Sequence, residues 1–137
     1  RLTCERLIDS PVEWYGPARL VGKTERDRFP QCLNDLPVLL PTGHSALRPT
    51  LDHWFEAQGL RPRIVGEFED SALLAVFAAR GLGVFPVSRL GADDIGLMRG
   101  LRVLGSSDGV KEEIHAIRSR RGHHHPLVLQ VIAAASR

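Results

Sequence analysis

Residues 38–86 decide the fold class of this chain: VLLPTGHSALRPTLDHWFEAQGLRPRIVGEFEDSALLAVFAARGLGVFP. The segment opens with an apolar run at 38–40, and further β-rich runs follow at 61–68 and 82–85. Between these runs the apolar residues recur every three to four positions, which is typical of helices that bury one face. Short strands alternating with helices at this spacing predict an α/β fold, with parallel strands joined by crossover helices.

Two helices are predicted within this segment. The first spans 47–58, where Ser45 is a suitable N-cap and Gly59 stands where a left-handed residue ends a helix. The second spans 71–80, with Asp70 as its cap. Both helices therefore begin directly after a predicted strand.

Outside this segment the sequence predicts four further short strands, over residues 2–8, 12–15, 101–104 and 112–118. Ser10-Pro11 separates the first two, the turn at 106–109 separates the last two, and Pro86 ends the 82–85 strand. Residues 22–34 read as a charged loop with a short helical turn. The chain finishes with a predicted apolar helix over 126–136.

Composition excludes several classes of protein. The 137 residues are 43% hydrophobic and 25% charged, as expected of one globular domain. A net charge of +2 is too small for nucleic-acid binding by the whole surface. No stretch approaches 18 uncharged apolar residues, so no spanning helix and no membrane partner are expected. Cys4 and Cys32 lack a C-x-x-C pattern and are expected to be reduced thiols of a cytoplasmic protein.

Known catalytic and cofactor motifs are missing from the sequence. There is no G-x-G-x-x-G, no phosphate-binding P-loop and no G-x-S-x-G elbow, so no cofactor and no catalytic residue are predicted. Three adjacent histidines at 123–125 cannot all face one ion, and we interpret them as a solvated basic loop rather than a metal site. An enzyme is therefore not expected.

Three polar segments are expected to meet at one edge of the sheet, at 41–45, 68–71 and 85–88. Each follows a predicted strand, and ligands of open α/β sheets bind beyond the carboxyl ends of the strands. The segments combine hydroxyls, backbone N–H groups, an imidazole, carboxylates and aromatic rings, which is the mixture of a small-molecule pocket. The candidate ligand-binding residues are Pro41, Thr42, Gly43, His44, Ser45, Phe68, Glu69, Asp70 and Pro86.

Each candidate also has a purely structural interpretation. Thr42 and Ser45 suit a turn and a helix cap, His44 suits a solvated loop, and Asp70 suits a cap better than a catalytic acid. Glu67 and Glu69 lie two apart on an extended segment and share one face, where a cation is a possible ligand. Two carboxylates alone are a weak metal signal, because hard cations usually take six or more oxygens.

Residues 39–86 resemble the effector-binding domain of LysR-type transcriptional regulators. The resemblance rests on the helix at 71–80 running into GLGVFP at 81–86, and more specifically on WFEAQGLRPRIVGEFEDSALLAVF at 54–77. The second stretch is similar to the branch of the family that activates sodium/proton antiporter genes. The general resemblance extends over nearly the whole chain.

The resemblance implies a periplasmic-binding-protein-like (type II) fold: a Rossmann-like lobe two with partial lobe one, its mixed sheet flanked by helices. Residues 11–110 would form regulatory lobe two, and 1–10 and 111–137 would be remnants of lobe one. The family's winged helix-turn-helix would then be missing, and the chain would be the later half of a longer regulator. By the same resemblance, the candidate residues of 41–44, 68–69 and Pro86 would line the cleft between the lobes.

A sensor that does not itself catalyse a reaction is therefore the first hypothesis. A small-molecule or ion effector would bind the cleft, the helix at 71–80 would mediate assembly into a dimer or tetramer, and DNA would be bound only through the missing domain. Sodium stress would make Glu67, Glu69 and Asp70 cation ligands, whereas an organic anion would suit Arg48. The alternatives are a two-lobed solute-binding protein and, ranked last, a small hydrolase using Ser45, His44 or Asp70. An exposed apolar stripe at 127–132 would add a further contact surface.

Overall fold

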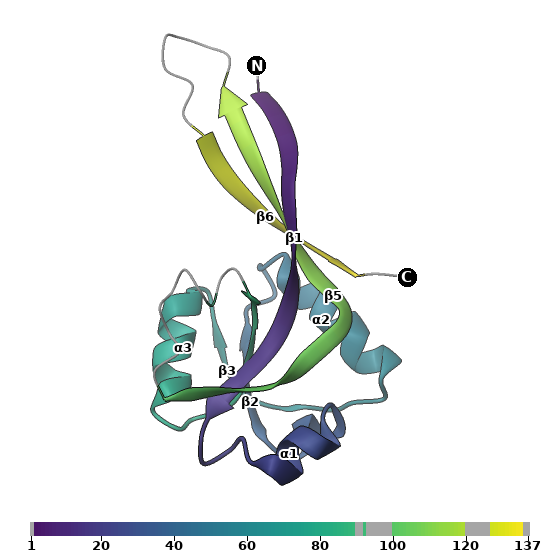
Figure 1. Ribbon diagram of the computed structural model, residues 1–137, viewed down its shortest axis with the longest axis vertical. Coiled ribbons are helices and arrows are strands. Elements are labelled where there is room, and N and C mark those ends of the chain that lie inside the picture. Colours follow the sequence, from purple (N-terminus) through teal and green to yellow (C-terminus); the bar gives the residue numbers. More distant parts are fainter. Residues whose placement is uncertain (1, 90–91, 93–99, 120–126, 136–137) are drawn as a thin grey trace.

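The computed structural model describes residues 2–89, 92, 100–119 and 127–135 (Figure 1). An α/β body carries a long β-ribbon that projects from one end of it. The histidines at 123–125 lie outside the described residues. No helix among the described residues has both the length and the apolar character needed to cross a bilayer.

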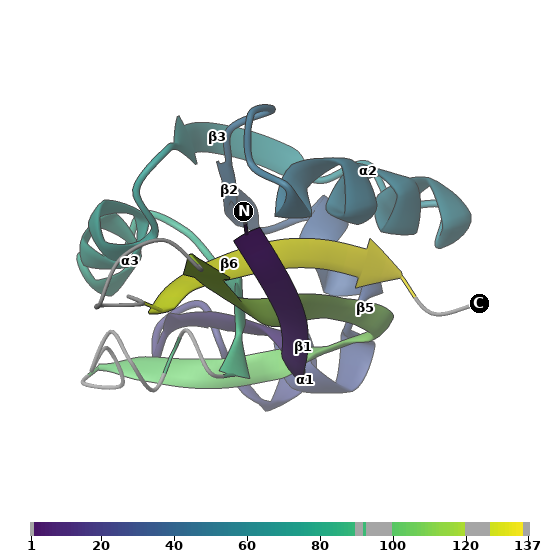
Figure 2. The same cartoon turned by 90° about the horizontal axis from the view of Figure 1, so that it is seen from above.

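The body is built on parallel strands, as the sequence predicts. Strand β2 (Pro37–Pro41) pairs in parallel with β3 (Arg63–Phe68), and helix α2 (Leu47–Ala57) makes the crossover between them. Helix α3 (Ser71–Ala79) leads from β3 to β4 (Phe85–Ser88). Figure 2 shows α2 and α3 on opposite sides of β2, in agreement with Figure 1.

Helix α2 forms because one of its faces is apolar and buried. That face consists of Leu47, Leu51, Trp54 and Phe55. Gly59 follows the helix with a φ of 68°, a left-handed conformation that favours glycine. The predicted cap is one residue off, because Ala46 holds the N-cap position. The Ser45 hydroxyl still accepts the Leu47 N–H at 3.2 Å.

Helix α3 begins as predicted and ends one residue earlier than predicted, with Arg80 as its C-cap. Asp70 is its N-cap, and Oδ1 of that residue accepts the backbone N–H of Ala72 at 2.8 Å. Gly81 lies just beyond the helix with a φ of 90°. Both predicted helices of the body are therefore confirmed, and their amino ends follow the carboxyl ends of β2 and β3.

The strands predicted on either side of the body are longer than the sequence indicates. Residues 2–8 and 12–15 belong to one strand, β1 (Leu2–Pro17), and 101–104 and 112–118 belong to β5 (Leu101–Ser119). Pro11 does not break β1, because the β1–β5 register shifts between Pro11 and Glu13, and such irregularities tolerate proline. Tertiary pairing thus overrides the local break signals.

Strand β4 also departs from the prediction, since Pro86 lies inside it rather than at its end. It occupies the edge of a four-stranded sheet with the order β4-β1-β5-β6, where proline's missing N–H is tolerated. The antiparallel register places Pro86 opposite Trp14 and Ser88 opposite Val12. Val84, the residue just before β4, forms a parallel bridge with Val38 of β2, and this bridge joins the two sheets.

The predicted C-terminal helix is wrong: residues 127–135 form strand β6 (Leu127–Ala135), antiparallel to β5. A short apolar run does not distinguish a helix from a buried strand by periodicity alone. The available edge of β5 decides here, because it supplies hydrogen-bonding partners for the whole run. The loop predicted at 22–34 contains two short helices, α1 (Lys23–Arg28) and the 3-10 helix Gln31–Asn34.

The strand directions fix which end of the body can bind a ligand. Strand β4 runs antiparallel to β1. Val84, which directly precedes β4, forms a parallel bridge with Val38 of β2, and β2 is parallel to β3, so β2, β3 and β4 all run in the same direction. The carboxyl ends of β2, β3 and β4 therefore all point toward the end from which the ribbon of β1, β5 and β6 projects (Figure 1). The opposite end carries α1.

Candidate functional site

Two of the three predicted segments meet directly at the carboxyl ends of β2 and β3. The backbone N–H of Thr42 donates to the carbonyl of Phe68 at 3.1 Å, and Pro41 is the register partner of Phe68. Thr42 is partly buried, whereas Gly43 and His44 are exposed. The loop at 41–45 and the start of α3 thus share one edge, as the sequence predicts.

The third segment, at 85–88, forms β4 and belongs to the four-stranded sheet rather than to the β2–β3 sheet. Pro86 is buried in the β4–β1 pair, and Phe85 lies with its ring centroid 6.1 Å from that of Tyr15. The bridge between Val38 and Val84 connects this strand to β2. Pro86 therefore belongs to the β-sheet framework beside the first two segments.

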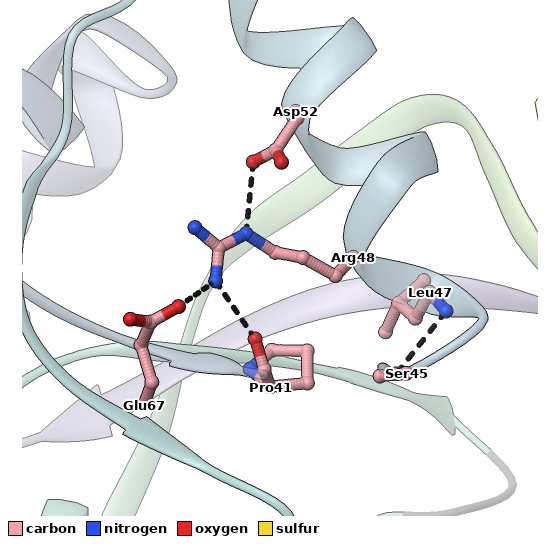
Figure 3. A network of polar contacts seen from close by, with 6 residues as sticks. All are labelled: Pro41, Ser45, Leu47, Arg48, Asp52 and Glu67. Atoms are coloured by element: carbon pink, nitrogen blue, oxygen red, sulfur yellow. Dashed lines mark hydrogen bonds and ion pairs between the residues drawn. The ribbon is translucent and has the colours of Figure 1, made fainter. Parts of the chain in front are cut away.

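Arg48 lies at the centre of a polar network below the 41–45 loop (Figure 3). Its Nη1 donates to the Pro41 carbonyl at 3.0 Å and pairs with the Glu67 carboxylate, and its Nε donates to Asp52 Oδ1 at 2.9 Å. Burial acts to lower the pKa of the guanidinium, but the hydrogen bonds to Glu67 and Asp52 outweigh it and raise that pKa. Arg48 thus already pairs with two carboxylates, and an organic anion would compete with both of them.

The acidic residues expected to bind a cation do not form one cluster. Glu67 pairs with Arg48, Asp70 caps α3, and Glu69 is exposed. Among residues 9–112 with described side chains, no group of three or more histidine, cysteine, aspartate or glutamate side chains is arranged to hold a metal. The expectation of a shared cation site at these three positions is therefore wrong.

Polar residues of the ribbon were missed by sequence reasoning. Ser10 in β1 is the cross-strand partner of Glu112 in β5, and Ser88 ends β4 nearby. Burial raises the pKa of the Glu112 carboxyl above its usual value, while a hydrogen bond with the Ser88 side chain acts to lower it. These residues lie far apart in the sequence, so only the strand pairing reveals that they meet.

Two ion pairs flank this group on the other face of the ribbon. Lys111 Nζ lies 3.2 Å from Asp9 Oδ2, and Arg89 Nε lies 3.0 Å from Glu13 Oε1. Asp9 and Lys111 directly adjoin Ser10 and Glu112 in sequence, and successive strand residues point to opposite faces. The ion pairs therefore do not compensate the charge of Glu112 directly.

The hydrolase alternative gains no support from the hydrogen bonds of the described side chains. The Ser45 hydroxyl accepts the Leu47 N–H, and the Asp70 carboxylate accepts the Ala72 N–H. Neither bond involves His44, so a nucleophile oriented by a base is not formed by these three residues in the structure.

Comparison with known proteins identifies the family. The family model described as LysR substrate binding domain matches residues 1–137. The chain belongs to this family. It is also 37% identical over 103 residues to the transcriptional activator protein NhaR of Escherichia coli (strain K12) and to its namesake from Shigella flexneri. These matches cover 75% of this chain and 34% of each relative, so the chain spans about a third of the curated relatives it matches.

Solved structures agree on the fold. The regulatory domain of Synechocystis CcmR in complex with 2-PG matches with a TM-score of 0.64 and 16% identity, covering 90% of this chain and 59% of that one. The bromide-bound regulatory domain of Salmonella typhimurium HypT matches with a TM-score of 0.64 and 16% identity, over 88% and 57% of the two chains. The fold of this LysR-family domain is thus the expected periplasmic-binding-protein-like α/β type.

Proposed function

We propose that this domain senses a small effector for a LysR-type transcriptional regulator. The observation that carries the proposal is the hydrogen bond between Thr42 and Phe68, which joins two polar segments at the carboxyl ends of β2 and β3. This edge faces the ribbon, and ligands of open α/β sheets bind at such edges. The proposed effector residues remain Pro41, Thr42, Gly43, His44, Ser45, Phe68, Glu69, Asp70 and Pro86.

The projecting ribbon supports the proposed division of the chain into two lobes. Residues 11–110 are proposed as lobe two, and 1–10 and 111–137 as the parts of lobe one present in this chain. Effector binding between the lobes would shift their arrangement and reposition a DNA-binding domain elsewhere in the intact protein. The location is proposed to be cytoplasmic, where such a regulator meets DNA.

The branch of the family suggests the physiological signal. The 37% identity to a transcriptional activator and the resemblance of 54–77 to antiporter-gene activators support a response to sodium or related stress. The family match and this relative do not favour a solute-binding protein, the runner-up in the sequence analysis. They also favour a regulator over an enzyme.

Self-association is proposed to use the outer face of α3 and β3. Large apolar side chains there remain exposed, including Val65 at 51%, Leu73 at 47% and Val76 at 44%. An exposed apolar face of this kind marks an interaction surface. A second copy of this LysR-family domain is the proposed occupant.

Two measurements test the effector proposal. A screen of candidate effectors by thermal shift is expected to find one that stabilises the chain and loses its effect in Thr42→Val and His44→Ala, while Thr24→Val on α1 serves as the control. A gel shift with this chain alone is expected to show no DNA binding. An effector that stabilises the Thr42→Val and His44→Ala variants as much as the unmodified chain would contradict the assignment. A salt-sensitive gel shift at sub-micromolar protein concentration would contradict it as well.

A further inference from the structure

A groove of about 530 Å³ lies between the carboxyl-terminal half of α2 and the amino end of β3. Its lining comes entirely from residues 52–64, so it contains none of the candidate effector residues. It is therefore a second concave surface of this domain, separate from the edge at which the loops 41–45 and 68–70 gather. A volume of this size is within the range of known binding sites.

The apolar part of the lining combines buried and open side chains. Phe55 of α2 and Leu60 are almost fully buried, whereas Ile64 of β3 is 41% exposed. Water therefore still reaches a large aliphatic side chain inside a concave surface. Covering that side chain with apolar groups of a partner removes its surface from water and favours association.

The charged part of the lining is mainly acidic. Asp52 and Glu56 are four residues apart on α2, so they project from the same side of the helix. Arg61 is the one basic residue of the lining, which leaves a single net negative charge in a chain whose net charge is +2. Among the ion pairs of the described side chains, Asp52 has its exposed pair with Arg48, and Glu56 takes part in none. The groove thus offers carboxylates to a positively charged group.

The turn between α2 and β3 holds the groove in shape. The Leu60 N–H donates to the Phe55 carbonyl at 2.8 Å, and the Arg61 N–H donates to Asn34 Oδ1 at 2.7 Å. Gly59 lies between these bonds, and a side chain there would meet no atom within 4 Å, so this border of the groove is open. Because the surface is already formed, little ordering free energy is lost when a partner binds.

We propose that this groove docks a segment of a partner protein in which a lysine or arginine lies beside large aliphatic side chains. The aliphatic groups cover Ile64, and the cation lies against Asp52 and Glu56. Small-molecule sites enclose most of their ligand, whereas these three side chains are open to solvent. An apolar centre with charged residues at its border is instead typical of protein interfaces. Opposite charges across such a border give specificity and speed association.

The groove is connected to the proposed effector edge through Asp52. Its Oδ1 accepts Arg48 Nε at 2.9 Å, and Arg48 Nη1 donates to the Pro41 carbonyl at 3.0 Å, directly before the candidate loop (Figure 3). A cation of the partner competes with Arg48 for the Asp52 carboxylate. That ion pair is exposed, so exchanging it costs little free energy. Docking therefore changes the hydrogen bonding of the residue that contacts the effector edge.

Fluorescence anisotropy of the complete chain with a labelled peptide tests the docking site. The probe is the capped tetrapeptide KLLK, and the comparison peptide is ELLE. We expect KLLK to bind saturably and ELLE to bind about tenfold or more weakly. Glu56→Lys should weaken the binding of KLLK by about tenfold, and Ile64→Thr by about threefold or more. Asp27→Lys replaces an exposed acid of α1 outside the groove and should leave binding unchanged.

The resonance of the Thr42 amide tests the connection to the effector edge. Bound KLLK should shift this resonance in the unmodified chain and much less in Asp52→Asn, which keeps Glu56 and Ile64 in the groove. The spectra also show whether each variant is folded. A Thr42 resonance that bound KLLK leaves unchanged overturns the connection.

The remaining outcomes decide the docking site itself. No saturable binding of KLLK, equal binding of both peptides, or binding that Glu56→Lys leaves unchanged overturns it. Self-association weakened by Glu56→Lys, without binding of KLLK, assigns the groove to a second copy of the chain and overturns the basic partner. The effector proposal is decided separately, by the Thr42 and His44 variants in the effector screen.

Discussion

The guanidinium of Arg48 and the carboxylate of Glu67 form an ion pair across 19 residues, joining the first turn of α2 to β3. The same guanidinium donates to the carbonyl of Pro41, at the carboxyl end of β2. The pair thus ties the crossover helix to both parallel strands at the edge proposed to bind an effector. We therefore interpret the Arg48–Glu67 ion pair as a structural link, since each charge is paired with the other inside the domain.

Removing Arg48 should cost more than removing Glu67. The Arg48 side chain is 14% exposed and that of Glu67 is 49% exposed. Arg48→Met leaves the Pro41 carbonyl without this donor and should lower the free energy of unfolding by about 1–2 kcal/mol. Glu67→Gln should lower it by about 0.5 kcal/mol, as is usual for more exposed pairs.

Urea denaturation measures both changes, and Asp52→Asn provides the control. That exposed i,i+4 pair should contribute only about 0.3–0.5 kcal/mol. Equal costs for the Arg48 and Asp52 variants would contradict a bridging role for Arg48.

The two tryptophans of the core should respond differently to the same substitution. Trp14 Nε1 donates to Ser107 Oγ at 2.5 Å, whereas Trp54 Nε1 is buried and has no hydrogen-bond partner among the described residues. Trp14→Phe loses a satisfied bond and leaves the buried Ser107 hydroxyl without this donor, whereas Trp54→Phe removes an unsatisfied donor. Trp14→Phe should therefore destabilise the fold by about 1–2 kcal/mol more.

Chemical denaturation of the two variants checks this difference directly. The rings have comparable settings, because their centroids lie 6.2 Å apart in a stacked arrangement. The comparison therefore cancels much of the cost of the smaller side chain. Equal destabilisation would show that ring packing, rather than the indole N–H, dominates at both sites.

Stability should fall at alkaline pH because of Cys32. Burial raises the pKa of its thiol from 9.0 to about 11, so the folded state holds the proton more tightly than the unfolded chain does. The stabilisation is fully present below pH 9 and is lost as the pH rises through 11. The free energy of unfolding should therefore decline between these values.

Comparing the chain with a Cys32→Ala variant, by urea denaturation from pH 8 to 11, isolates this contribution. Both proteins carry Cys4→Ser, so that Cys32 is the one thiol that differs. The pH-dependent decline should be smaller in the alanine variant. The same pH profile in both would exclude Cys32 as its source.

The outer face of α3 should control self-association. Val76 is 44% exposed, so Val76→Glu should leave the fold intact while placing a charge in an apolar contact. Sedimentation equilibrium is expected to show weaker association, by about tenfold or more, for this variant. Thr24→Glu adds the same charge on α1 and should change nothing. Unaltered association in Val76→Glu would direct attention to another surface.

Local signals in the sequence were sufficient where the structure is local. The apolar stripe of α2, the Asp70 cap of α3 and the glycines at 59 and 81 each act within one or two turns of chain. The same signals failed at Pro11, Pro86 and in the apolar run of β6, because pairing with distant strands decided those conformations. An edge or bulge position is a property of the assembled sheet, which no local window contains.

The sequence by itself determined the α/β body, its family and the edge at which polar loops gather, because these depend on periodicity and on the residues that start and stop elements. Only the tertiary structure decided what the charges do. It gave Arg48 two carboxylate partners and dispersed the acidic residues at 67–70. It also brought Ser10, Ser88 and Glu112 together from three strands. The physical reason is that charged and polar side chains interact only when they lie close together in space. Strand register sets that proximity between residues that are about a hundred positions apart in the sequence.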